Sequence, residues 1–300
     1  MRFLTRLITA SFICILVFIG CKKESSNALS TQEEEEVATF TAESEIESQF
    51  VFDDIFNNVI GVNAELGIGG VGIFGRTSTN SRVDGLDSVP LCAQVSVLPR
   101  ELGIFPKTVT IDFGSGCLSH NHLRSGKITT VYTGRLIQPG NSATTTFENF
   151  KIDSLSIEGT QVITNTTVSG ANQRQFTSEV KNAKITRQNG NYEEWNATRT
   201  ITQIEGNGTQ LPLDDIFRVT GSSDGKTRRG NLLVSWTSEI QEPLIKRFTC
   251  RWFSKGIIRS ERNGLASNAP WAAVLDFGDG SCDNKANVTV NGSSHQITLR

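Results

Sequence analysis

Two stretches of the 300-residue chain are near-copies of each other: VTIDFGSGC at residues 109–117 and AVLDFGDGSC at residues 273–282. In each copy, a strand-like apolar run leads into Asp-Phe-Gly, then into a glycine-bearing turn and a cysteine. Each copy also has one cysteine upstream, at Cys92 and Cys250. Glycine supplies the positive φ of such turns, and an aspartate side chain can cap nearby backbone N–H groups. We therefore interpret each copy as a pair of strands closed by a disulfide.

The N-terminus predicts export and a lipid anchor. Arg2 and Arg6 precede a mostly apolar run at 7–19, which is too short for a transmembrane helix and is typical of a signal peptide. The run ends VFIGC at Cys21, which resembles a bacterial lipobox. The resemblance implies a signal peptide of residues 1–20 and acylation of Cys21, by diacylglyceryl and palmitate groups, that holds the protein on the outer membrane. An ordinary secretory signal and an uncleaved anchor are the alternatives.

Cysteine usage agrees with export. Cys14 lies in the signal peptide and Cys21 would carry the lipid, which leaves four further cysteines. An even number of cysteines in an exported chain predicts two disulfides, with three possible connectivities. The repeat favours Cys92–Cys117 and Cys250–Cys282, because each pair brackets one copy of the motif. A zinc site of four thiolates is the rival interpretation, but the cysteines lack the close spacing that such sites use.

Charge and composition bear on partners and on the region after the signal peptide. Lysine and arginine number 29 against 31 aspartates and glutamates, which gives a formal net charge of −2. Nucleic-acid binding needs a concentrated basic surface, so we expect no nucleic-acid partner. Residues 21–43 are rich in serine and glutamate and poor in apolar residues. This composition predicts a disordered acidic tether between the membrane and the folded domain.

One helix is expected, at 44–62, where the single folded domain of residues 44–300 begins. Ser44 and Glu47 have the spacing of a capping box. Apolar residues recur on one face of the segment, while Asp53 and its polar neighbours are expected to face away. The pattern predicts an amphipathic helix that packs on a sheet.

The rest of the domain is expected to be strands. Runs rich in Thr, Val, Ile and Phe, such as 144–157, are separated by turn residues such as Glu158-Gly159, with no helical crossover. Consecutive strands should then be antiparallel, since parallel pairs need long crossovers. The predicted fold class is mainly β: an antiparallel β-sandwich or strongly curved sheet of about a dozen strands with the helix packed on it. The disulfide-closed unit would occur twice, at 91–137 and 248–300.

Several motifs together resemble a group of uncharacterised lipoproteins of the Bacteroidota. The motifs are the lipobox, TVTIDFG at 108–114 with its cysteine, RSGKI at 124–128, YTGR at 132–135, DFG at 276–278, CDN at 282–284 and VTVNG at 288–292. The likeness covers roughly residues 53–300. The resemblance implies a lineage and an envelope compartment, and it implies no activity.

Two groups of residues are candidate metal ligands. Asp276, Asp279 and Asp283 cluster around the second motif, and Ca²⁺ binds clustered oxygens. The alternative role for these carboxylates is to cap backbone N–H groups of the turn. His120 and His122 share one face of a strand but lack a third ligand, so we interpret them as exposed loop residues.

Two surface roles are also predicted. Trp195 lies among polar and charged neighbours, so it is expected to be exposed and to be a candidate for stacking on a ligand. Ser88 and Ser154 each follow an aspartate and precede an aliphatic residue. These triplets resemble the O-glycosylation signal of Bacteroidota proteins.

The sequence contains no constellation of catalytic residues that points to one reaction. It has no Gly-x-Ser-x-Gly nucleophile elbow and no free cysteine once the disulfides form. We therefore expect a protein that is not an enzyme and has no cofactor. The favoured function is a lipid-anchored envelope or cell-surface protein with a binding or structural role toward glycan or protein partners. The alternatives are a carrier of a lipid or other amphiphile in a curved sheet and, least favoured, a surface glycan hydrolase.

Overall fold

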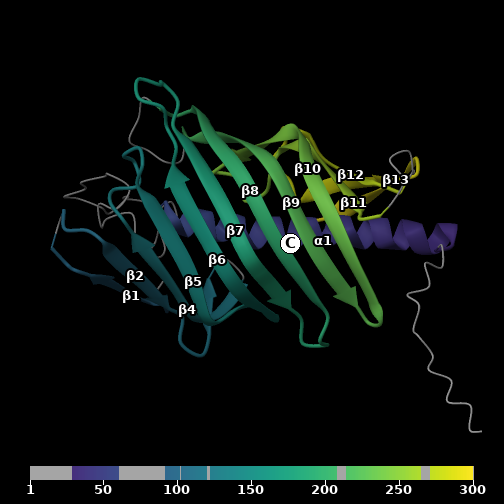
Figure 1. Ribbon diagram of the computed structural model, residues 1–300, viewed down its shortest axis with the longest axis horizontal. Helices are drawn as coiled ribbons and strands as arrows, with labels where there is room; N and C mark the ends of the chain where they lie inside the picture. Colours follow the sequence, from purple (N-terminus) through teal and green to yellow (C-terminus); the bar gives the residue numbers. More distant parts are fainter. Residues whose placement is uncertain are drawn as a thin grey trace, which may run out of the picture.

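The computed structural model describes residues 29–60, 92–101, 103–119, 122–207, 214–264 and 271–299. These residues form one antiparallel sheet of fourteen strands with one N-terminal helix, α1 (Thr31–Val59), packed against it. The strands follow one another across the helix in chain order (Figure 1). The prediction of a mainly β fold with an N-terminal helix is confirmed. The sheet is single and curved, so of the two predicted architectures the sandwich is wrong.

Nearly every strand pairs with its neighbour in the sequence, and only β3 lies off this path, as a short partner of β4. The strands are β1 (Gln94–Leu98), β2 (Lys107–Asp112), β3 (Cys117–Ser119), β4 (His122–Tyr132), β5 (Ser142–Ile152), β6 (Leu155–Asn165), β7 (Gln175–Thr186), β8 (Tyr192–Glu205), β9 (Ile216–Arg229), β10 (Leu232–Arg247), β11 (Lys255–Arg262), β12 (Ala273–Asp279), β13 (Lys285–Val290) and β14 (Ser293–Thr298).

One predicted strand is in fact two. The run 144–157 is divided between β5 and β6 by a two-residue turn in which Asp153 has a φ of 54°. The predicted turn at Glu158-Gly159 lies instead inside β6. A Cβ at Gly159 would approach the Cα of Ala183 to 2.7 Å, so this glycine permits close contact between β6 and β7.

The helix begins thirteen residues earlier than predicted. Ser30 accepts a hydrogen bond from the Glu33 backbone N–H, and the Glu33 carboxylate accepts one from the Ser30 backbone N–H at 2.8 Å. This reciprocal capping box starts the helix at Thr31, so the predicted cap at Ser44 is wrong. The predicted disordered tether at 21–43 is likewise wrong from residue 31 onward, because these residues are helical.

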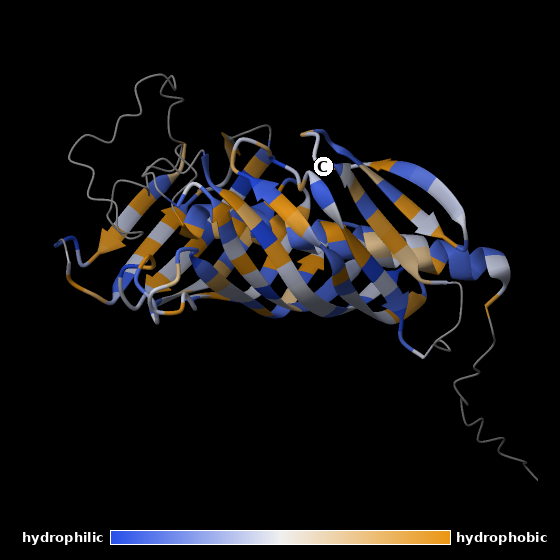
Figure 2. Cartoon of the chain, turned by 90° about the horizontal axis from the view of Figure 1, so that it is seen from above, coloured by the Kyte–Doolittle hydropathy of each residue, from blue (hydrophilic) through white to orange (hydrophobic). Residues whose placement is uncertain are grey.

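The helix is enclosed rather than packed through one stripe. Eighteen of its 29 residues are buried, including the consecutive residues Val51, Phe52 and Asp53. The prediction that Asp53 faces away from the sheet is therefore wrong. Inward-facing residues of the strands surround the helix, and their apolar side chains form one large core with it and a small cluster of Val37, Phe40 and Val234. Figure 2 shows the alternation of apolar and polar residues along the strands. The largest fully buried side chains of this core are Trp195, Trp236, Tyr132, Phe52, Phe56, Phe113 and Phe150.

Contacts between distant strands show how far the sheet curves. Asp54 on the helix pairs with Arg124 of β4, whereas Asp53 beside it pairs with Lys246 of β10. His122 at the start of β4 also contacts Arg251, which lies between β10 and β11. Strands that are far apart in the sheet order thus meet around the helix.

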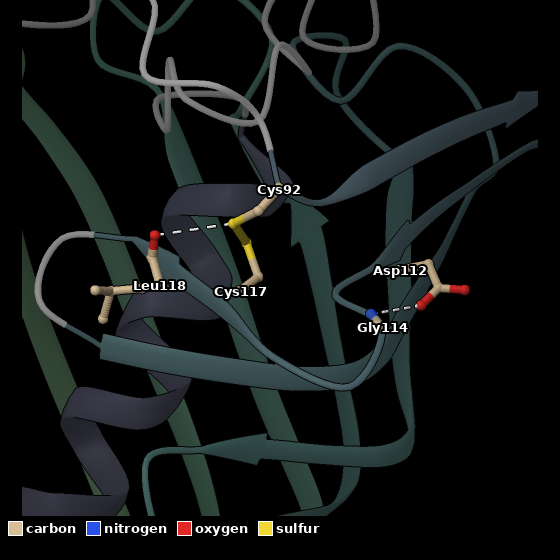
Figure 3. Close-up of a disulfide and its surroundings, with 5 residues drawn as sticks. All are labelled: Cys92, Asp112, Gly114, Cys117 and Leu118. Atoms are coloured by element: carbon tan, nitrogen blue, oxygen red, sulfur yellow. Dashed lines mark hydrogen bonds between the residues drawn. A yellow bond between two sulfur atoms is a disulfide. The ribbon is translucent and has the colours of Figure 1, made fainter.

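Both predicted disulfides are present. Cys92 is bonded to Cys117 and Cys250 to Cys282, with Cα–Cα distances of 5.3 and 5.7 Å. Figure 3 shows the first disulfide beside the Asp112 turn, in which the Asp112 carboxylate accepts a hydrogen bond from the Gly114 N–H at 2.8 Å. Asp276 accepts the same bond from the Gly278 N–H, also at 2.8 Å, so the two copies share one turn geometry. The predicted strand pair closed by a disulfide is therefore confirmed twice.

The disulfides indicate an extracytoplasmic protein, since such bonds persist in oxidising compartments. Among the described residues, no helix has the length and apolar character needed to cross a membrane.

Candidate functional site

Acidic side chains of α1 pair with basic side chains on the inner face of the sheet. Asp, Glu, Arg and Lys are seldom fully buried without a partner, and these pairs satisfy that requirement. The pairs join β4, β8, β10 and β11 to the helix, as well as the ends of β7 and β9. They are Glu34–Arg262, Glu43–Arg229, Glu45–Arg199, Glu47–Arg187, Asp53–Lys246 and Asp54–Arg124.

The most buried of these pairs is centred on Glu45. The Arg199 Nη2 donates to Glu45 Oε1 at 2.6 Å, and Arg199 Nε donates to Gln49 Oε1 at 2.9 Å. The Trp195 indole N–H and the Ser223 hydroxyl donate to Glu45 Oε2 at 2.9 and 2.7 Å. Three strand residues therefore hold one helix carboxylate, which fixes the position of the helix along the sheet.

Burial shifts several pKa values in this interior. Burial raises the pKa of Asp53, against the opposing effect of the Lys246 ammonium group. Burial lowers the pKa of Arg199, and the Glu45 carboxylate opposes this shift. Burial also raises the pKa of Glu193 to about 7, although Arg187 lies 3.6 Å from its carboxylate. A carboxyl group with a pKa near neutrality often marks a functional site, but Glu193 is enclosed beneath the helix.

A second charged cluster joins the start of β4 to the segment between β10 and β11. The His122 Nδ1 lies 2.6 Å from the Asp153 carboxylate, and its Nε2 contacts Arg251, between β10 and β11. Burial raises the pKa of Asp153, but hydrogen bonds from His122 and from the Leu123 N–H outweigh it and leave this pKa below its usual value. The sequence interpretation of His122 as an exposed loop residue is wrong, because it opens β4 and bridges two charged partners.

The outer face of the sheet carries a groove over β7 to β11, with a volume of about 570 Å³. Its lining mixes polar residues with the apolar Val180 and Ala197, and its charged members are four carboxylates and two basic groups. The charged lining residues are Glu179, Lys181, Asp224, Glu239, Arg259 and Glu261, and the uncharged polar ones are Asn196, Thr198, Ser222, Ser223, Thr237 and Ser238.

Irregular pairing between strands shapes this groove. The β7–β8 register shifts between Val180 and Ala183, and Asn182 within the shift has a φ of 53°. The Asn182 N–H donates to the Asn196 side-chain oxygen at 2.8 Å, and the Asn196 amide donates to Asp224 at 3.1 Å. A bulge of this kind re-aims side chains, and here it orients Asn196 and Asp224 along the groove.

Some charged residues of the groove form ion pairs with each other. Lys181 lies 2.8 Å from Glu179, and Arg259 lies 3.2 Å from Glu261. Asp224 and Glu239 are exposed carboxylates without a basic partner at salt-bridge distance among the described residues. The lining therefore has a net acidic character, suited to a ligand that carries positive charge and hydrogen-bond donors.

The structure separates the predicted site residues. The prediction that Trp195 is exposed is wrong: its side chain is 1% exposed, stacks on Phe52 with 5.5 Å between ring centroids and donates to Glu45. It is therefore closed off from any external ligand. Trp195, Ala197 and Arg199 share one strand face, and this alternation is the signal by which the sequence could have placed both Trp195 and Arg199 inside.

The predicted calcium ligands all cap turns. Asp276 accepts from the Gly278 N–H, Asp279 from the Ser281 N–H and hydroxyl, and Asp283 from the Lys285 N–H. Hydrogen bonds from Ser281 lower the pKa of Asp279. No group of three or more potential metal ligands is found within the described part of the chain. The alternative role as turn caps accounts for these three carboxylates.

The remaining predictions fall on different parts of the chain. Ser154 is exposed in the β5–β6 turn, and its glycosylation remains a prediction. Cys21, Ser88 and His120 lie outside the described residues.

Comparison of the chain with protein-family models, with curated proteins and with solved structures found no match. The functional argument therefore rests on the chain's own residues.

Proposed function

We propose that this protein is a membrane-anchored, non-catalytic binding protein of the cell envelope that recognises a cationic segment of a protein partner. The outer groove over β7 to β11 would be the recognition site. The observation that carries this proposal is the charge of the groove lining, in which carboxylates outnumber basic groups. The disulfides support an extracytoplasmic setting, and the lipobox supports an anchor at Cys21.

Two features favour a protein partner over a glycan. None of the described residues that line the groove is aromatic, whereas sugars are usually held by stacking on exposed aromatic rings. Its carboxylates lie on four of the five strands, at Glu179, Asp224, Glu239 and Glu261, which suits the spaced donors of an extended basic segment.

The carrier alternative is less well supported. A carrier in a curved sheet would need its concave face for the apolar ligand, but α1 fills that face with buried apolar and paired charged side chains. Loading such a ligand would leave Glu45 and Arg199 without each other, at a large cost in free energy. The hydrolase alternative would need an accessible general acid with a raised pKa, and Glu193, whose pKa is raised to about 7, is instead buried.

The groove can be tested with a defined probe. A fluorescein-labelled peptide of alternating lysine and serine should bind the full chain in detergent, as measured by fluorescence anisotropy. Reversing the charge of Glu239 and Glu261 together (Glu239→Lys, Glu261→Lys) should weaken binding roughly tenfold, with the difference shrinking at high salt.

The matched control is Glu205→Lys combined with Glu101→Lys, because both carboxylates lie outside the groove lining and the change in net charge is the same. Equal weakening by the control pair would show that the peptide follows net charge rather than the groove. Binding of neutral oligosaccharides in place of the peptide would overturn the choice of a protein partner.

The anchor has a separate test. Cys21→Ala should move the protein from the membrane fraction to the soluble fraction and abolish incorporation of labelled palmitate. Unchanged membrane association and labelling would contradict acylation at this residue.

A further inference from the structure

The last strand, β14, is an open edge of the sheet. Its inner side pairs with β13 from Lys285↔Thr298 to Val290↔Ser293 without a register shift. Its outer side pairs with no described strand. Five of its six residues are exposed, and only Ile297 is half-buried and packs against the core.

The register identifies which backbone groups are unpaired. The Leu299 N–H donates to the Asn284 carbonyl, so Asn284 and Leu299 form a hydrogen-bonded pair of the antiparallel ladder. Such pairs alternate along the strand, so Ser293, His295 and Ile297 direct their backbone groups to β13. The intervening residues Ser294, Gln296 and Thr298 direct their N–H and C=O groups outward.

Within the part of the chain that the structure describes, this edge lacks the usual protection. Native proteins block open edges with lysine, proline, bulges or a covering segment. Residues Ser293–Thr298 contain no ionisable group other than His295, no proline and no bulge. An edge of this kind accepts an additional antiparallel strand.

We propose that the occupant of this edge is the β14 strand of a second copy of the chain, paired antiparallel about a twofold axis at Gln296. Gln296 is the middle one of the three outward-facing residues, so this register uses all of them. Ser294 would pair with Thr298 of the second copy, Gln296 with its equivalent and Thr298 with Ser294, and each such pair exchanges two backbone hydrogen bonds.

The side chains are compatible with self-pairing. A twofold axis places residues of one strand against the same strand, so any lysine or glutamate near the axis would face a like charge. β14 has none. His295 would lie opposite Ile297 of the second copy, which extends the half-buried apolar surface at this edge.

Cysteine crosslinking tests the register in the full chain. Gln296→Cys should give a disulfide-linked dimer under mild oxidation, because the two new thiols would face each other. The matched control Ser294→Cys should crosslink much less, since its counterpart would lie opposite Thr298. Combining Ser294→Cys with Thr298→Cys should restore crosslinking. Equal crosslinking of Gln296→Cys and Ser294→Cys would overturn the register.

Sedimentation of the full chain in detergent tests the association itself. The native chain should show a concentration-dependent dimer. Gln296→Pro should raise the dissociation constant roughly tenfold or more, because it removes an outward N–H donor from both strands while leaving every bond to β13 intact. Gln296→Thr retains the N–H and should dimerise as the native chain does.

If Gln296→Pro alters the circular dichroism spectrum, Gln296→Lys replaces it, because two lysines would then oppose each other at the axis. A native chain that stays monomeric at all concentrations, or a dimer that persists in a folded Gln296→Pro or Gln296→Lys variant, would overturn the proposal.

Discussion

At the scale of single residues, the interior of this protein depends on charges that are tolerated only in pairs. Glu45 and Arg199 are 0% and 4% exposed, and each is the principal charged partner of the other. Removing one member of a buried pair leaves an uncompensated charge, whereas replacing both by apolar residues is often neutral.

Arg199→Met should therefore destabilise the fold by about 3–5 kcal/mol, measured by urea denaturation at pH 7. Adding Glu45→Leu to that variant should recover much of the loss. Arg259→Met is the control, because its pair with Glu261 is on the surface and should change stability by less than about 1 kcal/mol. A double variant as unstable as Arg199→Met alone would show that the pair provides more than charge compensation.

The buried Glu193 predicts an unusual pH dependence. Its pKa is raised from an ordinary value of 4.5 to about 7 in the folded protein, so folding takes up a proton between these values. The contribution of Glu193 to stability is thus most favourable below pH 4.5, falls as the pH rises through 7 and is then constant, with a total loss of roughly 3 kcal/mol.

Glu193→Gln should remove this slope, so its stability relative to the native chain should increase from pH 5 to pH 8 in urea denaturation. Glu194→Gln is the matched control, because the adjacent side chain points to the other face of β8. A difference between Glu193→Gln and the native chain that does not change with pH would contradict a raised pKa.

At the scale of elements, the strands could be predicted from the sequence more accurately than the helix. Alternation of Thr, Val, Ile and Phe located the strands because one face of most strands, such as β7 and β12, is buried in the core. The early part of α1 was missed because Glu34 and Glu43 make the segment look solvated, whereas they pair with Arg262 and Arg229. Such pairing joins residues about 200 positions apart in the sequence, so the composition of a short segment cannot predict it.

The same limit applies to the candidate site. The two disulfides followed from the repeat, since two copies of one motif suggested one pairing for both. The outer groove depends on the register shift at Asn182 and on side chains from five strands. Register is set by pairing between strands, so sequence periodicity alone could not place Asp224 beside Asn196.

The start of α1 gives a prediction at this scale. Ser30→Ala should destabilise the protein by about 0.5–2 kcal/mol, because it removes the side-chain acceptor for the Glu33 N–H. Ser44→Ala should have a smaller effect, because Ser44 lies in the interior of the helix, where backbone N–H groups already have partners. Thermal denaturation of both variants decides between the two caps, and a larger loss for Ser44→Ala would contradict the earlier start.

At the scale of the whole molecule, the curved sheet depends on contacts between β4 and the segment that follows β10 as well as on the helix. Cys117 of the first disulfide lies directly across from Arg124 in the β3–β4 pair, and the second disulfide includes Cys250, which precedes Arg251. Arg124 and Arg251 belong to the charged cluster that joins β4 to the segment between β10 and β11. In this cluster His122 contacts Arg251, and Asp54 pairs with Arg124. The two disulfides thus lie on the two sides of this contact, one beside β4 and the other at Cys250, between β10 and β11.

Removing either disulfide should therefore loosen the packing of the curved sheet around α1. Cross-links that close loops of 25 and 32 residues stabilise a fold by about 3–4 kcal/mol each through the entropy of the unfolded chain. Paired serine variants, Cys92→Ser with Cys117→Ser and Cys250→Ser with Cys282→Ser, should each lose about that much in urea denaturation. If both disulfides also stabilise the packing of the sheet around α1, hydrogen exchange of α1 amides should accelerate in either variant. The acceleration should exceed what the loss of global stability explains. Exchange that rises only in step with global unfolding would show that each disulfide acts on the unfolded chain alone.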